Sequence, residues 1–299
     1  MTHCGSIAAA ALALAVSGWA QPKRPAIVGV AHIRLKTNDL AAERKLFGHD
    51  FGFEEPFALD TVTCFKVNDH QYIEITPDLK DDAEDRLTHI AFETSNAEQL
   101  REYLASHGVK VPDAVKPGPD GDLSLMVQDP DGHAVEFVQY MPGSLHSRGF
   151  GKFLPATRIS ERIIHVGFLV QDRATEDGFY KDILGFKETW HGGMTDDRAD
   201  WIDMRVPDGT DWLEYMCNNR NPSVRTRGVM NHLALGVPNA EKGYQTLADR
   251  GAHLTEKPKI GRDGKWQLNL YDINLTRVEL MEPKPVQPPC CSPFVNQDF

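Results

Sequence analysis

Histidine and glutamate recur at matching places in four stretches of the chain. Each stretch opens on a strand-like segment that begins with histidine, and it closes, after a nearly constant interval, on a strand that carries glutamate between apolar residues. The opening histidines are His32, His89, His165 and His232, and the closing glutamates are Glu74, Glu136, Glu214 and Glu279. Imidazole nitrogens and carboxylate oxygens are common ligands of divalent metals. The repeated pair therefore predicts at least one metal site assembled from several strands.

Alternation along the closing strands places each glutamate opposite its apolar neighbours. In residues 71–76, Ile73 and Ile75 point to one side and Glu74 to the other. Burying a carboxylate without a partner is costly, and a bound cation removes that cost. A single histidine would be better interpreted as a core residue, and a single glutamate as a solvent-facing one. Four repeats in phase favour metal ligands instead.

Each histidine strand is followed by a helical pattern with cap residues at its ends. The four patterns begin near Asn38, Asn96, Arg173 and Asn239, and a glycine follows each one. Strand-like segments with turn signals come next. Each unit is therefore predicted to fold as βαβββ, which gives four units and an α+β fold class.

The length of 299 residues is sufficient for two domains with filled cores. The widest gap between units is rich in glycine, serine and proline, and we interpret it as a linker. The predicted division is a first domain at 27–140, a linker at 141–160, a second domain at 161–283 and a tail at 284–299, with two units in each domain.

Composition and the first residues bear on partners and localisation. The net charge of −11 argues against nucleic acid as a partner. Residues 7–16 form an apolar run that is too short to span a bilayer and ends in small residues, so 1–20 is predicted to be a signal peptide cleaved after Ala20. The predicted localisation is periplasmic or secreted. A cytoplasmic protein is the alternative, because the leader lacks Lys and Arg. No later segment is predicted to cross a membrane.

The cysteines give no sign of a disulfide framework. Cys290 and Cys291 are adjacent in the proline-rich tail, where they are interpreted as incidental or as a link to another chain. Cys64 and Cys217 lie in strand-like stretches and are expected in the core.

Two stretches resemble a known superfamily. Residues 165–186 are similar to the opening signature of glyoxalase I, and residues 129–136 are similar to the closing hairpin of the same group. From about Val28 to Pro283 the chain resembles the vicinal oxygen chelate superfamily, which includes glyoxalase I, extradiol dioxygenases and bleomycin resistance proteins. The resemblance implies that pairs of units form cup-shaped open barrels, each with a metal held by residues from the first and last strands of both units.

The resemblance also implies two ligand sets and a substrate class. One set combines His32, Glu74, His89 and Glu136, and the other combines His165, Glu214, His232 and Glu279. This grouping assumes that adjacent units pair; a pairing of outer with outer and inner with inner units stays open. The cofactor would be a divalent metal, with Fe(II), Mn, Ni, Co and Zn all open. The substrate would be a small molecule that chelates through vicinal oxygens, and Glu136 or Glu279 would shuttle a proton.

Three functions follow from this resemblance. Four donors for each site favour lyase or isomerase chemistry through an enolate-like intermediate. The first alternative is an extradiol-type ring-cleaving dioxygenase that uses Fe(II), although Tyr271 lies nearer the last glutamate than that signature has it and Ile273 replaces its proline. The second alternative is a metal-free binding or sequestering protein like the bleomycin resistance proteins.

Four further residues are weaker candidates for substrate contact. Arg34 shares a strand face with His32, and either an anionic substrate or a neighbouring carboxylate would suit it. His191 lies beside glycines in a loop that either covers a pocket or lies on the surface. Trp201 and Arg205 share one strand face with Asp203. The oligomeric state stays open, a homodimer included.

Overall fold

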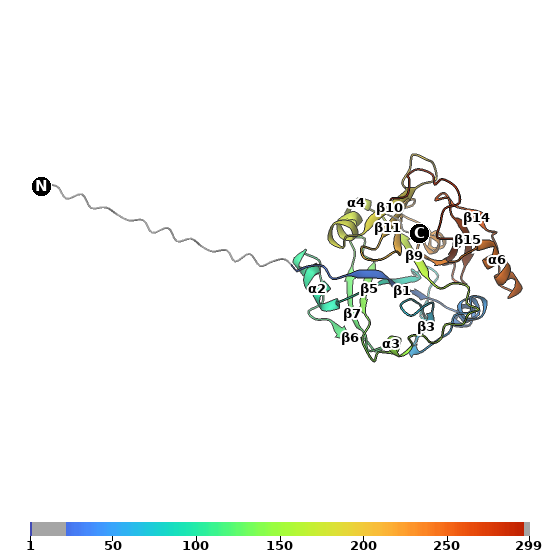
Figure 1. Ribbon diagram of the computed structural model, residues 1–299, viewed down its shortest axis with the longest axis horizontal. Helices are drawn as coiled ribbons and strands as arrows, with labels where there is room; N and C mark the ends of the chain where they lie inside the picture. Colours follow the sequence, from blue (N-terminus) through green and yellow to red (C-terminus); the bar gives the residue numbers. More distant parts are fainter. Residues whose placement is uncertain (2–21, 296–299) are drawn as a thin grey trace.

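The computed structural model describes Met1 and residues 22–295. Residues 2–20 of the predicted signal peptide and the last four residues of the tail lie outside the described residues. Two eight-stranded mixed sheets, one from each half of the chain, form the body of the protein (Figure 1). Within each half the elements follow the order βαβββ twice, so the predicted α+β fold of repeated units is confirmed. Among the described residues, no helix has the length and apolar character needed to cross a membrane.

The first sheet joins the first two units in the spatial order β2-β3-β4-β1-β5-β8-β7-β6. Its strands are β1 (Ile27–Lys36), β2 (Ala58–Leu59), β3 (Val62–Lys66), β4 (Tyr72–Thr76), β5 (Leu87–Thr94), β6 (Lys116–Pro117), β7 (Leu123–Gln128) and β8 (Ala134–Gln139). Its helices are α1 (Leu40–Glu43), which continues as the π-helical segment η1 (Arg44–Asp50), and α2 (Ala97–Ser106).

The second sheet repeats this order as β10-β11-β12-β9-β13-β16-β15-β14. Its strands are β9 (Ile163–Leu169), β10 (Lys187–Gly192), β11 (Trp201–Arg205), β12 (Trp212–Met216), β13 (His232–Gly236), β14 (Lys259–Ile260), β15 (Trp266–Tyr271) and β16 (Arg277–Met281). Its helices are α4 (Arg173–Glu176), continued as η2 (Asp177–Ile183), α5 (Val224–Met230) and α6 (Ala240–Asp249). Adjacent units therefore share a sheet, which decides between the two pairings left open above.

Local sequence explains where the helices start and which face of each sheet they cover. The side chains of Asp39, Asn96, Asp172 and Asn239 each accept a backbone N–H at a helix N-terminus. Leu100 and Leu104 of α2 are buried in the same core as Ile73 and Ile75 of β4. The helices thus cover the apolar face of each sheet, and the glutamates are left on the concave face.

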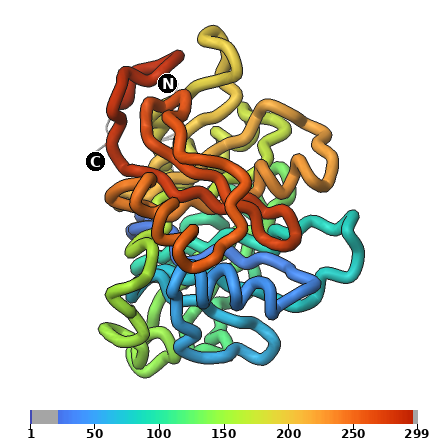
Figure 2. The backbone as a smooth tube through the Cα atoms, turned by 90° about the vertical axis from the view of Figure 1, so that its right-hand side faces the viewer, coloured from blue at the N-terminus to red at the C-terminus, as the bar shows by residue number. Residues whose placement is uncertain are grey.

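The two domains stack on each other, with the first half of the chain below and the second above in Figure 2. Side chains of one domain bond to backbone of the other. Gln71 Nε2 donates to the Ile163 carbonyl at 2.9 Å, and Val30 N donates to Asp211 Oδ2 at 2.9 Å. These contacts accompany the packing of β1 against β9 at the boundary between the two domains.

The segment that follows the last strand of each domain packs back onto that domain. In the linker, α3 (Leu145–Arg148) is held close because Lys66 Nζ donates to the carbonyls of Gly149 and Lys152. In the tail, Cys290 and Cys291 are joined by a disulfide. The interpretation of these cysteines as incidental, or as a link to another chain, is therefore wrong, because the two sulfurs bond to each other within one turn.

Candidate metal centres

Strand register brings the first ligand set together. Four neighbouring strands, β4, β1, β5 and β8, carry one candidate ligand each. Across β1 and β5, His32 pairs with Ala91, and across β5 and β8 the same Ala91 pairs with Glu136. The small alanine side chain between them leaves the concave face open. His89, two residues before Ala91, joins them there.

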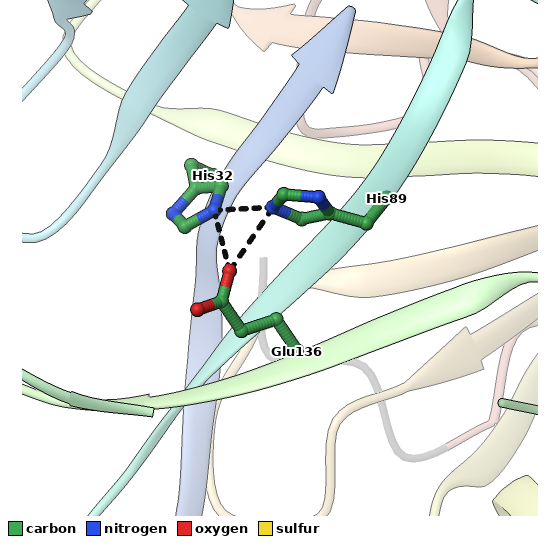
Figure 3. Close-up of side chains that lie close together, drawn as sticks. All are labelled: His32, His89 and Glu136. Atoms are coloured by element: carbon green, nitrogen blue, oxygen red, sulfur yellow. Dashed lines mark hydrogen bonds and ion pairs between the residues drawn. The ribbon is translucent and has the colours of Figure 1, made fainter. Parts of the chain in front are cut away.

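Three donor atoms of the first cup lie almost equally far from one another. His32 Nε2 is 2.9 Å from His89 Nε2 and 3.1 Å from Glu136 Oε2, and His89 Nε2 is 3.0 Å from the same oxygen (Figure 3). Metal–ligand bonds of about 2.1 Å at right angles place neighbouring donors about 3.0 Å apart. These three atoms therefore have the spacing of one face of an octahedral site, and their residue types fit a divalent metal.

Glu74, the fourth predicted ligand of this cup, is held by Arg34. Its Oε2 accepts from Arg34 Nε at 2.7 Å and from Nη2 at 2.5 Å, and it lies 3.6 Å from His32 Nε2. The side chain of Glu74 is 1% exposed, so the guanidinium supplies the positive charge that this buried carboxylate requires. The first cup therefore presents two imidazoles and one carboxylate as candidate donors, while the second carboxylate, that of Glu74, is bound by Arg34.

The second cup gathers the equivalent residues less tightly. His165 Nε2 is 3.1 Å from His232 Nε2 and 3.6 Å from Glu279 Oε2, while Glu214 Oε2 is 3.1 Å from His232 Nε2. His165, His232 and Glu279 form the compact group of donors here. The spread of distances is wider than in the first cup, so this set is less well prepared for a single ion.

Arg277 lies among the candidate ligands of the second cup. Its Nη1 is 3.2 Å from Glu279 Oε1, and its Nη2 is 3.0 Å and 3.1 Å from the two ring nitrogens of His232. Near-equal distances to both nitrogens place Nη2 over the ring face. The Nδ1 of His232 donates to the Met230 carbonyl at 2.7 Å, which leaves its Nε2 lone pair facing the cup.

Two models of the Glyoxalase/Bleomycin resistance protein/Dioxygenase superfamily match the chain, one at residues 29–137 and the other at residues 164–269. The chain belongs to this superfamily. The resemblance predicted from the sequence is thereby confirmed. No curated protein sequence matches the chain.

Solved structures of this superfamily share the fold. The Mn(II)-bound glyoxalase from Novosphingobium aromaticivorans is 17% identical with a TM-score of 0.67, and the match covers 86% of this chain and 83% of that one. Homoprotocatechuate 2,3-dioxygenase from Brevibacterium fuscum, in complex with 3,4-dihydroxyphenylacetate, is 19% identical with a TM-score of 0.63, over 87% and 82% of the two chains. At these identities the likeness establishes the fold alone.

Burial and pairing shift the pKa values of the candidate ligands in the first cup. Burial works to raise the pKa of Glu136, but hydrogen bonds with His32 and His89 outweigh it and hold that pKa well below the usual range. Burial lowers the pKa of His89. For His32, burial also works to lower the pKa, yet Glu74 and Glu136 outweigh it and the pKa is raised. In the metal-free cup, His32 is therefore the imidazole that keeps a proton.

In the second cup, too, burial and neighbouring charges shift the pKa values of the candidate ligands in opposite directions. Burial lowers the pKa of His165 well below its ordinary value. The pKa of Glu214 falls to about 2, because the hydrogen bond and charge of His232 outweigh the effect of burial. Glu214 is therefore ionised throughout the pH range in which the protein would work.

Glycine at position 167 makes room for His232. The two residues pair across β9 and β13, and a Cβ built on Gly167 would lie 2.0 Å from His232 Cε1. The imidazole thus occupies the space of a missing side chain. In the first domain the equivalent position, two residues after the histidine of the first strand, is Arg34.

A cavity lies over each ligand set. The first, of about 300 Å³, is lined by His32, Glu74 and Glu136, and also by Arg34 and His146. Sequence reasoning missed His146, because α3 of the linker carries it and no strand pattern marks it. Its Nδ1 is 2.6 Å from Asp122 Oδ2, a hydrogen bond that holds the linker against the first domain.

The second cavity, of about 570 Å³, is lined by three tryptophans, Trp190, Trp201 and Trp212, and by part of the tail. Trp201, one of the weaker candidates for substrate contact, therefore lines this cavity. The other two weak candidates of this domain are not among the described residues that line the cavity. His191 Nδ1 lies 2.7 Å from Glu188 Oε1, and Arg205 Nε donates to the Gly209 carbonyl at 2.7 Å.

Proposed function

We propose that the chain is a divalent-metal enzyme of the dioxygenase type, which binds a small substrate through vicinal oxygens in the first cup. The observation that carries this proposal is the trio of donors, His32, His89 and Glu136, at mutual distances of 2.9 to 3.1 Å. Two histidines and one carboxylate on one face of the coordination sphere are typical of non-haem Fe(II) oxygenases. A metal held in this way would act as a Lewis acid that lowers the pKa of substrate hydroxyls.

Arg34 supports the oxygenase assignment. By pairing with Glu74 it keeps that carboxylate ionised and occupied, so the donor set stays at three and more positions are left for substrate and oxygen. The positive charge of Arg34 also lines the cavity, where it would stabilise a substrate oxyanion. The sequence predicted four donors at this site, and that number favoured lyase or isomerase chemistry. Pairing of Glu74 with Arg34 leaves three.

Lyase or isomerase chemistry remains the second candidate, because Glu74 is close. Its Oε2 lies 3.6 Å from His32 Nε2, so a change in the Arg34 side chain would bring it among the donors. In that reaction Glu136 would be the carboxylate that moves a proton, as proposed from the sequence, with Glu279 its counterpart in the second cup. The Mn(II)-bound glyoxalase shares the fold and supports this candidate.

Oxygen consumption separates the candidates. We would load the protein anaerobically with Fe(II) and follow oxygen uptake over a panel of catechols, with His89→Ala as the control that removes one donor. The dioxygenase proposal expects uptake in the wild type and none in the variant. Turnover of α-hydroxycarbonyl compounds without oxygen would instead support the isomerase. A protein that binds catechols equally well before and after metal removal would be a metal-free binder.

We also propose that the protein is exported to the periplasm or secreted. The support is the leader pattern in residues 1–20 together with the disulfide between Cys290 and Cys291, since disulfides persist in oxidising compartments. N-terminal sequencing of the mature protein tests this proposal, which expects a chain that starts at Gln21.

A further inference from the structure

The tail forms a strap, residues 283–295, that runs between the two edges of the second sheet. At one edge, Val286 N donates to the Gly264 carbonyl at 2.9 Å and Cys290 N donates to the Arg262 carbonyl at 2.8 Å, both in the turn between β14 and β15. At the other edge, Val295 N donates to the Thr189 carbonyl of β10 at 2.8 Å. Because β14 and β10 are the outermost strands, the strap closes the open side of the cup.

The middle of the strap is a wall of the second cavity. Pro288, Pro289 and Cys290 line the cavity. Trp190 Nε1 donates to the Cys290 carbonyl at 3.2 Å. Next along the chain, Ser292 Oγ accepts from the His191 N–H at 2.9 Å and lies 3.0 Å from the His191 carbonyl. Opening this side of the cavity therefore requires the strap to leave β10.

The disulfide sits in a turn whose backbone is unfavourable for an ordinary residue. Cys291 has φ +71°, in the left-handed region, and Ser292 N donates to the Cys290 carbonyl at 2.8 Å. This is a three-residue turn with a positive central φ, a rare and strained form. The ring closed by the Cys290–Cys291 bond supports that conformation. The same turn presents the Cys290 carbonyl to Trp190 and the Ser292 hydroxyl to β10.

We propose that the Cys290–Cys291 disulfide locks the strap over the second cup, and that reduction by a dithiol releases it. A thiolate of the dithiol attacks one of the two sulfurs and forms a mixed disulfide, while the other cysteine leaves as a thiolate and takes up a proton. The second thiol of the reagent then displaces the remaining cysteine. Two electrons pass to the strap, and the reagent becomes a cyclic disulfide. Cys291 then relaxes to negative φ, and the contacts with β10 are lost. This lock does not depend on the metal proposed for the first cup.

The surroundings of the bond favour such an exchange. Cys290 and Cys291 are both partly exposed, so a small dithiol can reach them. Cys291 Sγ is 3.7 Å from Arg262 Nη2, and a neighbouring guanidinium stabilises a thiolate. The other two cysteines described by the structure, Cys64 and Cys217, are free thiols, and Cys64 is buried.

Hydrogen exchange of the full-length chain tests the lock. The amides of residues 286–295 are compared before and after treatment with dithiothreitol, with thiol alkylation to count the cysteines released. The proposal expects exchange in the strap to become faster by roughly tenfold, equivalent to about 1.4 kcal/mol. Peptides from β9 and β13 serve as the internal standard, because they should keep their protection if the fold is intact. Acrylamide quenching of tryptophan fluorescence should rise in parallel, as the tryptophans of the second cavity become accessible.

Two variants make the test specific. A double Cys290→Ser, Cys291→Ser variant should show the fast strap exchange without dithiothreitol and no further response to it. Cys217→Ser, which removes a thiol away from the strap, should respond as the wild type does. The proposal is overturned if strap exchange is the same before and after reduction, or if alkylation of the oxidised protein finds Cys290 and Cys291 already free.

Discussion

Arg34 and Arg277 each bring a guanidinium into one cup, but from positions that are not equivalent in the repeat. Arg34 lies two residues after the histidine of a first strand, where the second domain has Gly167. Arg277 lies two residues before the glutamate of a last strand, where the first domain has Ala134. Each domain thus places a cation beside its buried carboxylates by a different route. Arg34 binds one oxygen of Glu74, which lies outside the group of three donors in its cup, whereas Arg277 contacts His232 and Glu279, two members of the donor group in its own cup.

Replacing Arg34 with Met should destabilise the metal-free protein and strengthen its metal binding. Loss of the guanidinium leaves the buried Glu74 carboxylate with the more distant His32 imidazole, at 3.6 Å, as its remaining cationic neighbour, which should cost about 3 kcal/mol of unfolding free energy. Added Mn(II) should restore the melting temperature, because Glu74 can then act as a fourth donor. Thermal unfolding with and without Mn(II) measures both effects.

The control for this variant is Arg34→Lys, which keeps a positive charge beside Glu74 but has only a single ammonium group. It should lie between the wild type and Arg34→Met in both measurements. If Arg34→Met bound Mn(II) more weakly than the wild type, then Arg34 would be supporting the donor set rather than withholding Glu74 from it.

Gly167→Ala should disturb the second cup through His232. The new methyl group would lie 2.0 Å from His232 Cε1, so the imidazole must move, and overpacking of this kind costs roughly 1–3 kcal/mol. Urea denaturation measures the loss. Gly178→Ala in η2 is the matched control, because nothing lies within 4 Å of its Cβ, and alanine there should be neutral or slightly stabilising. Equal losses of unfolding free energy in the two variants would show that the clash with His232 is not the cause.

Two buried glutamates at the domain interface predict that stability falls as pH rises. Burial, reinforced by Asp272, raises the pKa of Glu43 to about 9, and burial, reinforced by Asp129, does the same for Glu176. Below a pH of about 4.5 both glutamates are protonated in the folded and the unfolded chain. Between 4.5 and 9 only the folded chain keeps these protons, so each glutamate lowers the unfolding free energy as the pH rises through this range.

Urea denaturation at several pH values between 5.5 and 8.5 measures that slope. A double Glu43→Gln, Glu176→Gln variant should have a flatter profile, because the amides cannot ionise. Glu102→Gln on the exposed side of α2 should leave the slope unchanged. A wild-type profile that stays flat to pH 8.5 would show that the folded chain does not keep the protons of these two carboxyl groups.

The sequence repeat made most of the fold predictable. The side-chain pairs that do not follow the repeat could not be predicted from it. The alternation around Glu74 and the caps such as Asn96 anticipated the sheets and the helix starts. The local sequence pattern does not indicate whether Arg34 contacts a substrate or Glu74, because the partner of Arg34 depends on the register of β1 against β4. His146 and the path of the strap across the second cavity escaped prediction for a related reason. Both lie after the last strand of a domain, in proline- and glycine-rich segments whose path is fixed only by long-range contacts.

The central claim is that His32, His89 and Glu136 together hold a divalent metal. The most direct test is elemental analysis of protein purified from its native compartment. The wild type is compared with a His89→Ala variant prepared in the same way. The account predicts at least one equivalent of metal per chain in the wild type and the loss of one equivalent in His89→Ala. Wild-type protein without metal, or a His89→Ala variant with undiminished metal content, would contradict it.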